Sequence, residues 1–240
     1  MKIIGLIPAR MQSSRFPGKP LFLIMGKPMI YWVYNRAVQV KELDEIYIIT
    51  EDEIIKNECK KLNIPCILDN KKSTVALERL SRVSRKLDGD IYLNIQGDEP
   101  IISIQAIEQI ITNMIKFEDV YYLGLRSLIT SKEEFFNKNT VKVVVDNEEY
   151  AMYFSRSGIP NKFSDLDNFK VLGLYGYRAE FLNKFITLPK SNLEYLEGGV
   201  EMLRAMQSGY KIKVIKTEHS SLGVDTIEDA YKVENIMKRL

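Results

Sequence analysis

The most conspicuous chemistry in the sequence is a short basic segment that follows the first apolar run of the chain. Residues 8–20 read PARMQSSRFPGKP, with three cations, hydroxyl side chains and a glycine: Arg10, Arg15, Lys19, Ser13, Ser14 and Gly18. Point charges, forked guanidinium groups and backbone N–H donors are the groups that bind polyphosphates. The segment matches neither the P-loop nor the dinucleotide-binding glycine pattern, which argues against a hydrolytic ATPase or a dehydrogenase. It indicates a polyphosphate site, although a solvated basic loop has the same composition.

A second segment supplies carboxylates. Residues 94–100 read NIQGDEP and follow an apolar run at 90–96, so that Gly97 permits a sharp turn and Asp98 lies just beyond a strand. A carboxylate that faces a polyphosphate repels it unless a divalent cation lies between them. Mg²⁺ binds one or two carboxylates together with phosphate oxygens. Asp98 is therefore a candidate metal ligand, and a plain acidic turn is the alternative.

A third candidate lies near the C-terminus, where GVDT at 223–226 separates the last predicted strand from the last predicted helix. Asp225 stands either as the cap of that helix or as a second carboxylate for the same metal. The sequence alone leaves both roles open.

Composition limits the classes of protein that the chain can belong to. Of 240 residues, 34 are Lys or Arg and 32 are Asp or Glu, a balance that argues against bulk binding of nucleic acid or membrane surfaces. No apolar run approaches the roughly 20 residues of a membrane span, and the first eight residues lead straight into a strand rather than a signal peptide. Cys59 and Cys66 read as free thiols of a reducing compartment, and His219 is the single histidine, too far away to complete a zinc site. We expect a cytoplasmic protein.

The first half of the chain alternates between strand and helix patterns. Strands are expected at 2–8, 45–50, 65–68, 90–96 and 121–128, and helices at 29–39, 53–62, 75–87 and 104–116. Ser73 or Thr74 is available to cap the third of these helices. This order predicts a mostly parallel sheet with helices on both faces, and ligands of such sheets bind at the carboxyl ends of the strands. The basic segment and Asp98 both lie at such ends.

The second half has a different character. Strand patterns at 141–146, 150–156 and 170–178 have no long helices between them, which predicts an antiparallel extension of the same sheet. The first two are rich in β-branched and aromatic residues, and we expect their uncovered face to pack against a two-fold mate. A helical region at 194–207 is interrupted by Gly198-Gly199, a strand follows at 211–216, and a last helix at 226–239 begins with a capping box at Thr226 and Asp229.

Six segments in one order closely resemble the 3-deoxy-manno-octulosonate (Kdo) cytidylyltransferases, or CMP-Kdo synthetases. They are IIGLIPARMQSSRFPGKPL, NIQGDEP, NTVKVVVD, YFSRSGIP, GLYGYR and GVDTIEDA, and the likeness covers nearly all of the chain. The resemblance implies a Rossmann-like nucleotidyltransferase fold in a single domain, 1–240, with a CTP-binding part at about 1–130, a sugar-binding and dimerisation part at about 131–225 and a closing helix at 226–240. It also implies transfer of CMP from CTP to the anomeric hydroxyl of Kdo with release of pyrophosphate, Mg²⁺ as cofactor, a homodimer, and a route to lipopolysaccharide or capsule.

The resemblance also assigns roles to residues. Asp98 and Asp225 match the metal ligands, and Arg10, Lys19 and Asp98 match catalytic positions. The nucleotide-binding positions are Pro8, Ala9, Arg10, Ser14, Arg15, Lys19, Arg79 and Gln96. The sugar-binding positions are Gln96, Arg156, Tyr175 and Glu201.

The chain departs from the family pattern on the base and sugar sides. Val75-Ala76-Leu77 stand where the family has Ser-Gly-Thr, Val171 replaces a His, and Met202 replaces a Gln in a helix broken by Gly198-Gly199. A pocket that loses polar groups usually meets a different ligand. Strict recognition of cytosine and the choice of sugar acid therefore stay open. The alternatives are the same reaction on an amino-substituted Kdo or another ulosonate, and a catalytically silent nucleotide-binding or interaction protein.

Overall fold

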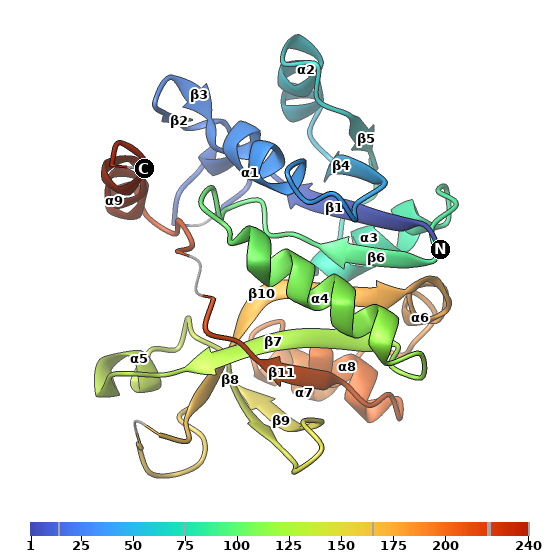
Figure 1. Cartoon of the computed structure of the whole chain (residues 1–240), viewed down its shortest axis with the longest axis vertical. Helices are drawn as coiled ribbons and strands as arrows, with labels where there is room; N and C mark the ends of the chain where they lie inside the picture. The colour runs from blue at the N-terminus through green and yellow to red at the C-terminus, as the bar shows by residue number, and fades with distance from the viewer. Residues whose placement is uncertain (14, 74, 165, 220–221, 240) are drawn as a thin grey trace.

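The computed structural model describes residues 1–13, 15–73, 75–164, 166–219 and 222–239 (Figure 1). Ser14 and Thr74, both named above, lie outside the described residues. A mixed sheet runs through the molecule in the order β11-β7-β10-β6-β1-β4-β5. Its strands are β1 (Ile3–Ala9), β4 (Glu45–Thr50), β5 (Cys66–Leu68), β6 (Ile91–Asn94), β7 (Tyr122–Leu128), β10 (Phe169–Arg178) and β11 (Lys213–Lys216). The predicted α/β class is confirmed.

The parallel part of the sheet is built around β1, the first strand. It pairs in parallel with β4 on one side and with β6 on the other, and β4 pairs in parallel with β5. Every residue of β1 except Pro8 is buried, as expected of a strand that is covered on both faces. Because successive connections leave β1 towards opposite edges of the sheet, a crevice opens at the carboxyl ends of β1 and β6.

The predicted antiparallel part is present, and one of its three strands lies in the interior of the sheet. β8 (Lys142–Val145) and β9 (Ala151–Ser155) pair with each other beside the start of β10. β10 itself lies inside the sheet, antiparallel to both β6 and β7, rather than on an added edge. A register shift between Val171 and Tyr175 separates its two pairing regions. Its length of 10 residues allows it to serve both as a central strand and as the partner of β8.

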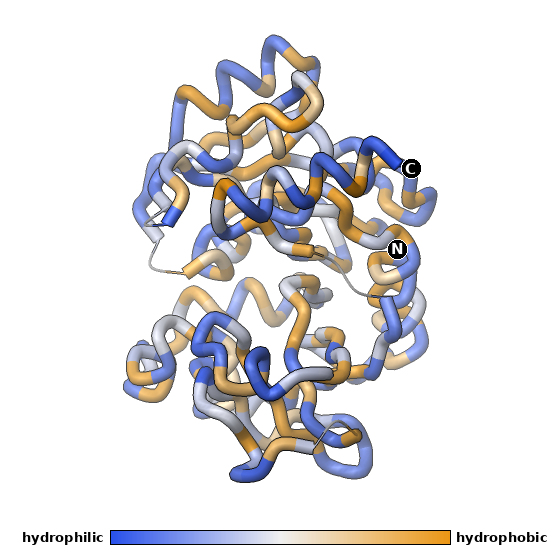
Figure 2. The backbone as a smooth tube through the Cα atoms, turned by 90° about the vertical axis from the view of Figure 1, so that its left-hand side faces the viewer, coloured by the Kyte–Doolittle hydropathy of each residue, from blue (hydrophilic) through white to orange (hydrophobic). Residues whose placement is uncertain are grey.

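Helices cover both faces of the sheet (Figure 1). One face carries α1 (Met29–Ala37), α2 (Glu53–Lys61) and α4 (Ile104–Lys116), and the other carries α3 (Ala76–Ser84), α6 (Ala179–Phe185), α7 (Asn192–Leu196) and α8 (Met202–Gln207). Each set buries an apolar stripe, such as Ile107 and Ile110 of α4 or Leu77 and Leu80 of α3. Figure 2 shows the corresponding alternation of hydrophobic and hydrophilic residues along the outer helices.

A third, smaller hydrophobic core packs the last helix of the chain beside the basic segment. There α9 (Ile227–Met237) packs near the hairpin of β2 (Leu23–Ile24) and β3 (Lys27–Pro28), and Phe16 and Val224 are buried in the same cluster. The predicted capping box of Thr226 and Asp229 is confirmed. The remaining short helices are α5 (Lys132–Phe136) and the 3₁₀ turn η1 (Lys19–Leu21). This core holds residues 16 and 224 together although they are far apart in sequence.

Cys59 and Cys66 are free thiols, as predicted. The predicted hydroxyl cap of α3 is wrong for Ser73: Val75 is the N-cap residue and has no side-chain cap bond, while the Ser73 hydroxyl accepts from Arg82 at 2.6 Å. Among the described residues, no helix combines the length and the hydrophobicity needed to cross a membrane.

Candidate functional site

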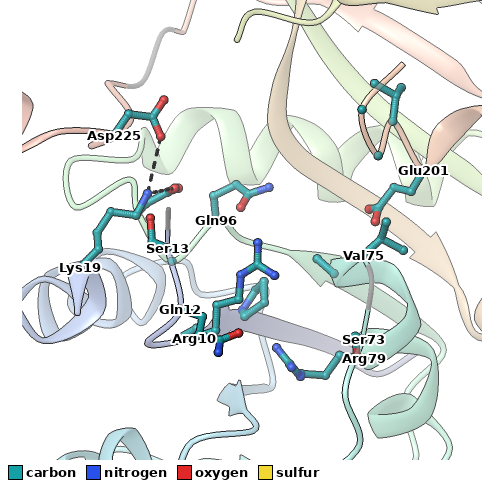
Figure 3. A pocket seen from close by; sticks show the side chains of 18 of the residues that line it. Arg10, Gln12, Ser13, Lys19, Ser73, Val75, Arg79, Gln96, Glu201 and Asp225 are labelled. Carbon is teal, nitrogen blue, oxygen red and sulfur yellow. Dashed lines mark hydrogen bonds and ion pairs between the residues drawn. The ribbon is translucent and has the colours of Figure 1, made fainter. Parts of the chain in front are cut away.

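A cavity of about 490 Å³ opens at the carboxyl ends of β1 and β6. All of the site residues predicted from the sequence that the structure describes line it: Pro8, Ala9, Arg10, Arg15, Lys19, Arg79, Gln96, Asp98, Arg156, Tyr175, Glu201 and Asp225. The fold therefore brings together residues that span more than two hundred positions of the chain. In Figure 3 the guanidinium group of Arg10 points into this cavity, with Lys19 and Asp225 on one side and Val75 and Glu201 on the other.

One wall of the cavity carries a compact cluster of opposite charges. The Lys19 ammonium donates to Asp98 Oδ2 at 2.6 Å and lies 3.6 Å from Asp225 Oδ1 (Figure 3). Arg15 Nη2 donates to Asp225 Oδ1 at 2.9 Å. Asp225 is not the cap of α9, because Thr226 takes that role. Its carboxylate is thereby left to face Asp98 across the lysine.

Backbone contacts fix the chain at Asp98 and Asp225 independently of Lys19. The Val224 N–H donates to the Asp98 carbonyl at 2.9 Å, and the Asp225 N–H donates to Asp229 Oδ2 at 3.2 Å. At Gly97 an added Cβ would lie 2.4 Å from the Pro8 carbonyl oxygen, so only glycine allows β1 and the turn after β6 to approach this closely. The backbone that carries the two aspartates is therefore preorganised.

This pair fits a hard divalent cation. Both carboxylates contact one ammonium group, which shows that their oxygens converge on a single positive charge. Over the described ranges there is no group of three or more His, Cys, Asp or Glu side chains that could hold a metal by itself. Mg²⁺ commonly takes one or two carboxylates and completes its shell with water and substrate phosphate oxygens. Asp98 and Asp225 form such an incomplete set.

Two acidic residues that were not predicted position the basic ones. Asp52 accepts from the Met11 N–H at 2.7 Å and so holds the start of the basic segment. Glu51 pairs with Arg79 at 2.6 Å, and the Arg79 side chain is only 4% exposed. Both acids follow β4 directly, which is the same carboxyl-end position that singled out Arg10 and Asp98. That position was the signal that could have identified them.

The opposite wall holds a buried carboxylate. Glu201 accepts from the Leu77 N–H at 3.1 Å through Oε2. Burial raises the pKa of Glu201 to about 7, and the Leu77 N–H opposes this rise by stabilising the ionised form. Burial also raises the pKa of Tyr175, so its hydroxyl stays protonated and able to donate a hydrogen bond.

The pKa of Glu201 predicts how folding stability depends on pH. A glutamate in the unfolded chain has a pKa of about 4.3, so the folded protein holds this proton more tightly and the resulting stability is lost as pH rises through 7. We expect Glu201→Gln, measured by urea unfolding, to gain about 2–3 kcal/mol relative to wild type between pH 5 and pH 8. The exposed change Glu42→Gln is the control, and parallel stability curves for wild type and Glu201→Gln would contradict the shifted pKa.

Arg156 is tied to the backbone around the glycine turn. Its guanidinium donates to the carbonyls of Glu197 at 2.9 Å, Lys138 at 3.0 Å and Gly198 at 3.4 Å. Gly198 and Gly199 both have positive φ, and they separate α7 from α8 as predicted. Arg156 therefore shapes this turn as well as lining the cavity.

Lys142 supports the backbone at Arg156, a role that was not predicted from the sequence. It is fully buried, and its ammonium donates to the carbonyls of Asn137, Thr140 and Arg156 at 2.6–2.9 Å. Burial lowers its pKa. The signal for this role was a single lysine within the apolar run VKVVV at 141–145.

The positions that depart from the family pattern do not all reach the cavity. Val75, Ala76 and Met202 line it. Val171, expected in the sugar pocket, packs instead against the apolar cluster that contains Phe154. The register shift in β10 next to Val171 accounts for this placement, because the strand only joins β6 from Tyr175 onwards.

The fold and the cavity define a nucleotide-binding α/β protein in which a basic loop and a carboxylate pair lie at the carboxyl ends of β1 and β6. A family model described as cytidylyltransferase matches residues 4–212. The 3-deoxy-manno-octulosonate cytidylyltransferase of Fusobacterium nucleatum is 41% identical, over 99% of this chain and 98% of its own. The enzyme of the same name from Geotalea daltonii is 39% identical, over 99% of both chains.

A solved structure of CMP:2-keto-3-deoxy-manno-octonic acid synthetase complexed with CTP superposes with a TM-score of 0.92 at 36% identity, covering 100% of this chain and 99% of that one. The chain belongs to the cytidylyltransferases and, among them, to the 3-deoxy-manno-octulosonate cytidylyltransferase family. The family predicted from the six sequence motifs is thereby confirmed.

Proposed function

We propose that the protein transfers CMP from CTP to the anomeric hydroxyl of Kdo and releases pyrophosphate, in a route to lipopolysaccharide or capsule. The names of full-length relatives and the CTP complex of the similar structure support this reaction. The observation that carries it is the convergence of Arg10, Lys19, Asp98 and Asp225 on one cavity. Pyrophosphate release that requires both CTP and Kdo tests the proposal.

The reaction needs charge stabilisation more than proton transfer. The anomeric hydroxyl loses its proton to solvent water and its oxygen forms a bond to the α-phosphorus of CTP, while the bond from that phosphorus to the pyrophosphate oxygen breaks. Negative charge therefore builds on the leaving oxygen and the nonbridging oxygens. Arg10, Arg15 and Lys19 supply fixed positive charges along the wall where the triphosphate would lie. Positioning of the two substrates in one cavity supplies most of the remaining acceleration.

Asp98 and Asp225 are the residues that would hold Mg²⁺. When bound, Mg²⁺ neutralises charge on phosphate oxygens and makes a nearby hydroxyl more acidic. In the structure the two carboxylates hold Lys19, and a triphosphate offers that ammonium an alternative set of anionic partners.

The sugar acid would occupy the wall opposite the charged cluster. A guanidinium pairs with a carboxylate in a forked geometry that lysine cannot reproduce, which favours Arg156 as the partner of the sugar carboxylate. Gln96, Tyr175 and Glu201 line the same region and can hydrogen-bond sugar hydroxyls. Met202 lines the cavity where the family has a Gln, and this loss of a polar side chain keeps, as a second candidate, the same reaction on an amino-substituted Kdo or another ulosonate.

We also propose a homodimer formed through the part of the chain that contains β8 and β9. Met152 of β9 is 62% exposed, and Tyr195 and Leu196 at the end of α7 are 83% and 74% exposed. Exposed apolar side chains of this size are typical of protein interfaces. The free thiols support a reducing compartment, and we place the protein in the cytoplasm.

The dimer gives a direct prediction. Stable dimers persist at protein concentrations in the micromolar range. We therefore expect sedimentation velocity at about 5 µM protein to show a single species of twice the chain mass. Met152→Asp should shift this species towards monomer, because it places a charge in the proposed interface. A wild-type monomer under these conditions would refute the interface.

A further inference from the structure

Among the residues that the structure describes at the start of helix α3, the N-cap position provides no side-chain cap. Val75 is its N-cap residue, in extended conformation, and makes no side-chain cap bond. The first N–H groups of a helix have no partner within the helix, and a buried N–H without a partner is costly. At α3 the acceptor comes from another part of the chain, because Glu201 Oε2 accepts from the Leu77 N–H at 3.1 Å in a buried setting.

A second bond joins the same parts of the fold. Arg204 Nη1 donates to Glu78 Oε1 at 3.0 Å, and Nε and Nη2 of Arg204 donate to Glu194 at 2.6 and 2.7 Å. Glu201 and Arg204 are thus the two points at which the start of α8 holds the first turn of α3. The arginine also bridges to α7 through Glu194.

The first turn of α3 carries a cavity residue. Arg79 lies on α3, two residues after Leu77, and it lines the cavity while its guanidinium pairs with Glu51. Val75 and Ala76 line the cavity as well. Glu201, Val200 and Met202 line it from the α8 side. The bond from Leu77 to Glu201 therefore joins the two walls. Figure 3 shows the side chains of Val75 and Glu201 next to each other at this point.

We propose that Glu201 is a positioning residue for the nucleotide side of the cavity: its carboxylate caps the Leu77 N–H and keeps the first turn of α3, and with it Arg79, in the arrangement that binds CTP. The inference rests on the proposed function, since it takes CTP as the ligand. Glu201 lies on the sugar side of the cavity, and by this inference it affects nucleotide binding without contacting the nucleotide. If the first turn is only partly formed, the apparent affinity falls by the fraction that is competent to bind.

The test is the affinity for CTP without any sugar acid, measured by isothermal titration calorimetry. Glu201→Ala should weaken CTP binding about tenfold, the size expected for loss of a helix N-cap. Glu201→Gln keeps an oxygen acceptor of the same shape, and its affinity should stay within about threefold of wild type. Glu42→Ala and Glu42→Gln, at an exposed position, are the matched controls for charge.

A double-mutant cycle shows whether the effect passes through α3. Arg79→Ala should weaken CTP binding in wild type and weaken it clearly less in the Glu201→Ala background, because the arginine is already misplaced there. Circular dichroism and thermal unfolding establish that each variant is folded. The inference would be overturned if Glu201→Ala bound CTP within about twofold of wild type. It would also be overturned if the fold-changes in CTP affinity of the two single variants multiplied to give that of the double variant. Wild type that fails to bind CTP at all would contradict the proposed function itself.

Discussion

Replacing Asp98 with asparagine is expected to lower kcat by about 100- to 1000-fold, the range seen when one preorganised electrostatic group is removed from an active site. The change keeps the shape of the side chain and removes its charge. In the structure that charge faces Lys19 at 2.6 Å and lies beside Asp225. Asparagine would leave a weaker set of ligands for Mg²⁺ and an ammonium group with one anionic partner fewer.

Folding should survive this substitution. The backbone carbonyl of Asp98, and not its side chain, accepts from Val224, and the side chain is 32% exposed. Thermal unfolding of the variant is the control, and Asp88→Asn, outside the cavity, is the matched charge change. A variant with near-normal turnover at saturating Mg²⁺ would remove Asp98 from the mechanism.

The second large effect is expected at Lys19. Lys19→Ala should lower kcat about 100-fold and also raise the KM for CTP, because a fixed cation on the triphosphate wall acts on the charge that develops in the transition state as well as on binding. Its side chain is 13% exposed and contacts Asp98 and the Val224 carbonyl, so the ammonium group already lies at the cavity before substrate arrives. Steady-state kinetics with CTP as the varied substrate measures both constants.

The kinetic pattern separates the possible roles of the lysine. Lys27→Ala, at an exposed position in the neighbouring hairpin, controls for the loss of one positive charge. A change in KM alone would mean that Lys19 binds ground state and transition state equally. The assignment of Lys19 as a catalytic residue would then be wrong.

Local patterns predicted most of the parallel part of the fold. The strand Glu45–Thr50 and the helix Ile104–Lys116 have the predicted bounds, because a buried strand and an amphipathic helix each show their own period in the sequence. The candidate site followed from one rule: segments that come after parallel strands meet at one edge of the sheet. Arg10 after β1 and Asp98 after β6 obey it, and Glu51 after β4 obeys it too although it was not named.

Long-range contacts could not be predicted in the same way. The place of β10 between β6 and β7 depends on which strands pair. The alternation of side chains along a strand indicates which face is buried, but it does not identify the neighbouring strands. The cap of α3 by Glu201 joins residues 124 positions apart, and nothing around Val75 indicates it. The carbonyl contacts of Arg156 depend on a glycine turn whose course is set only in the folded chain.

The central claim is the transfer of CMP from CTP to Kdo, and pyrophosphate release with CTP, Mg²⁺ and a panel of sugar acids tests it most directly. The panel contains Kdo, an amino-substituted Kdo and another ulosonate, and mass spectrometry identifies the CMP-sugar formed. We expect pyrophosphate and CMP-Kdo in equal amounts, the highest kcat/KM for Kdo, and formation of both products about 100- to 1000-fold more slowly in Asp98→Asn. Preference for a different acid would contradict the choice of Kdo, and no pyrophosphate with any acid would contradict the proposed reaction.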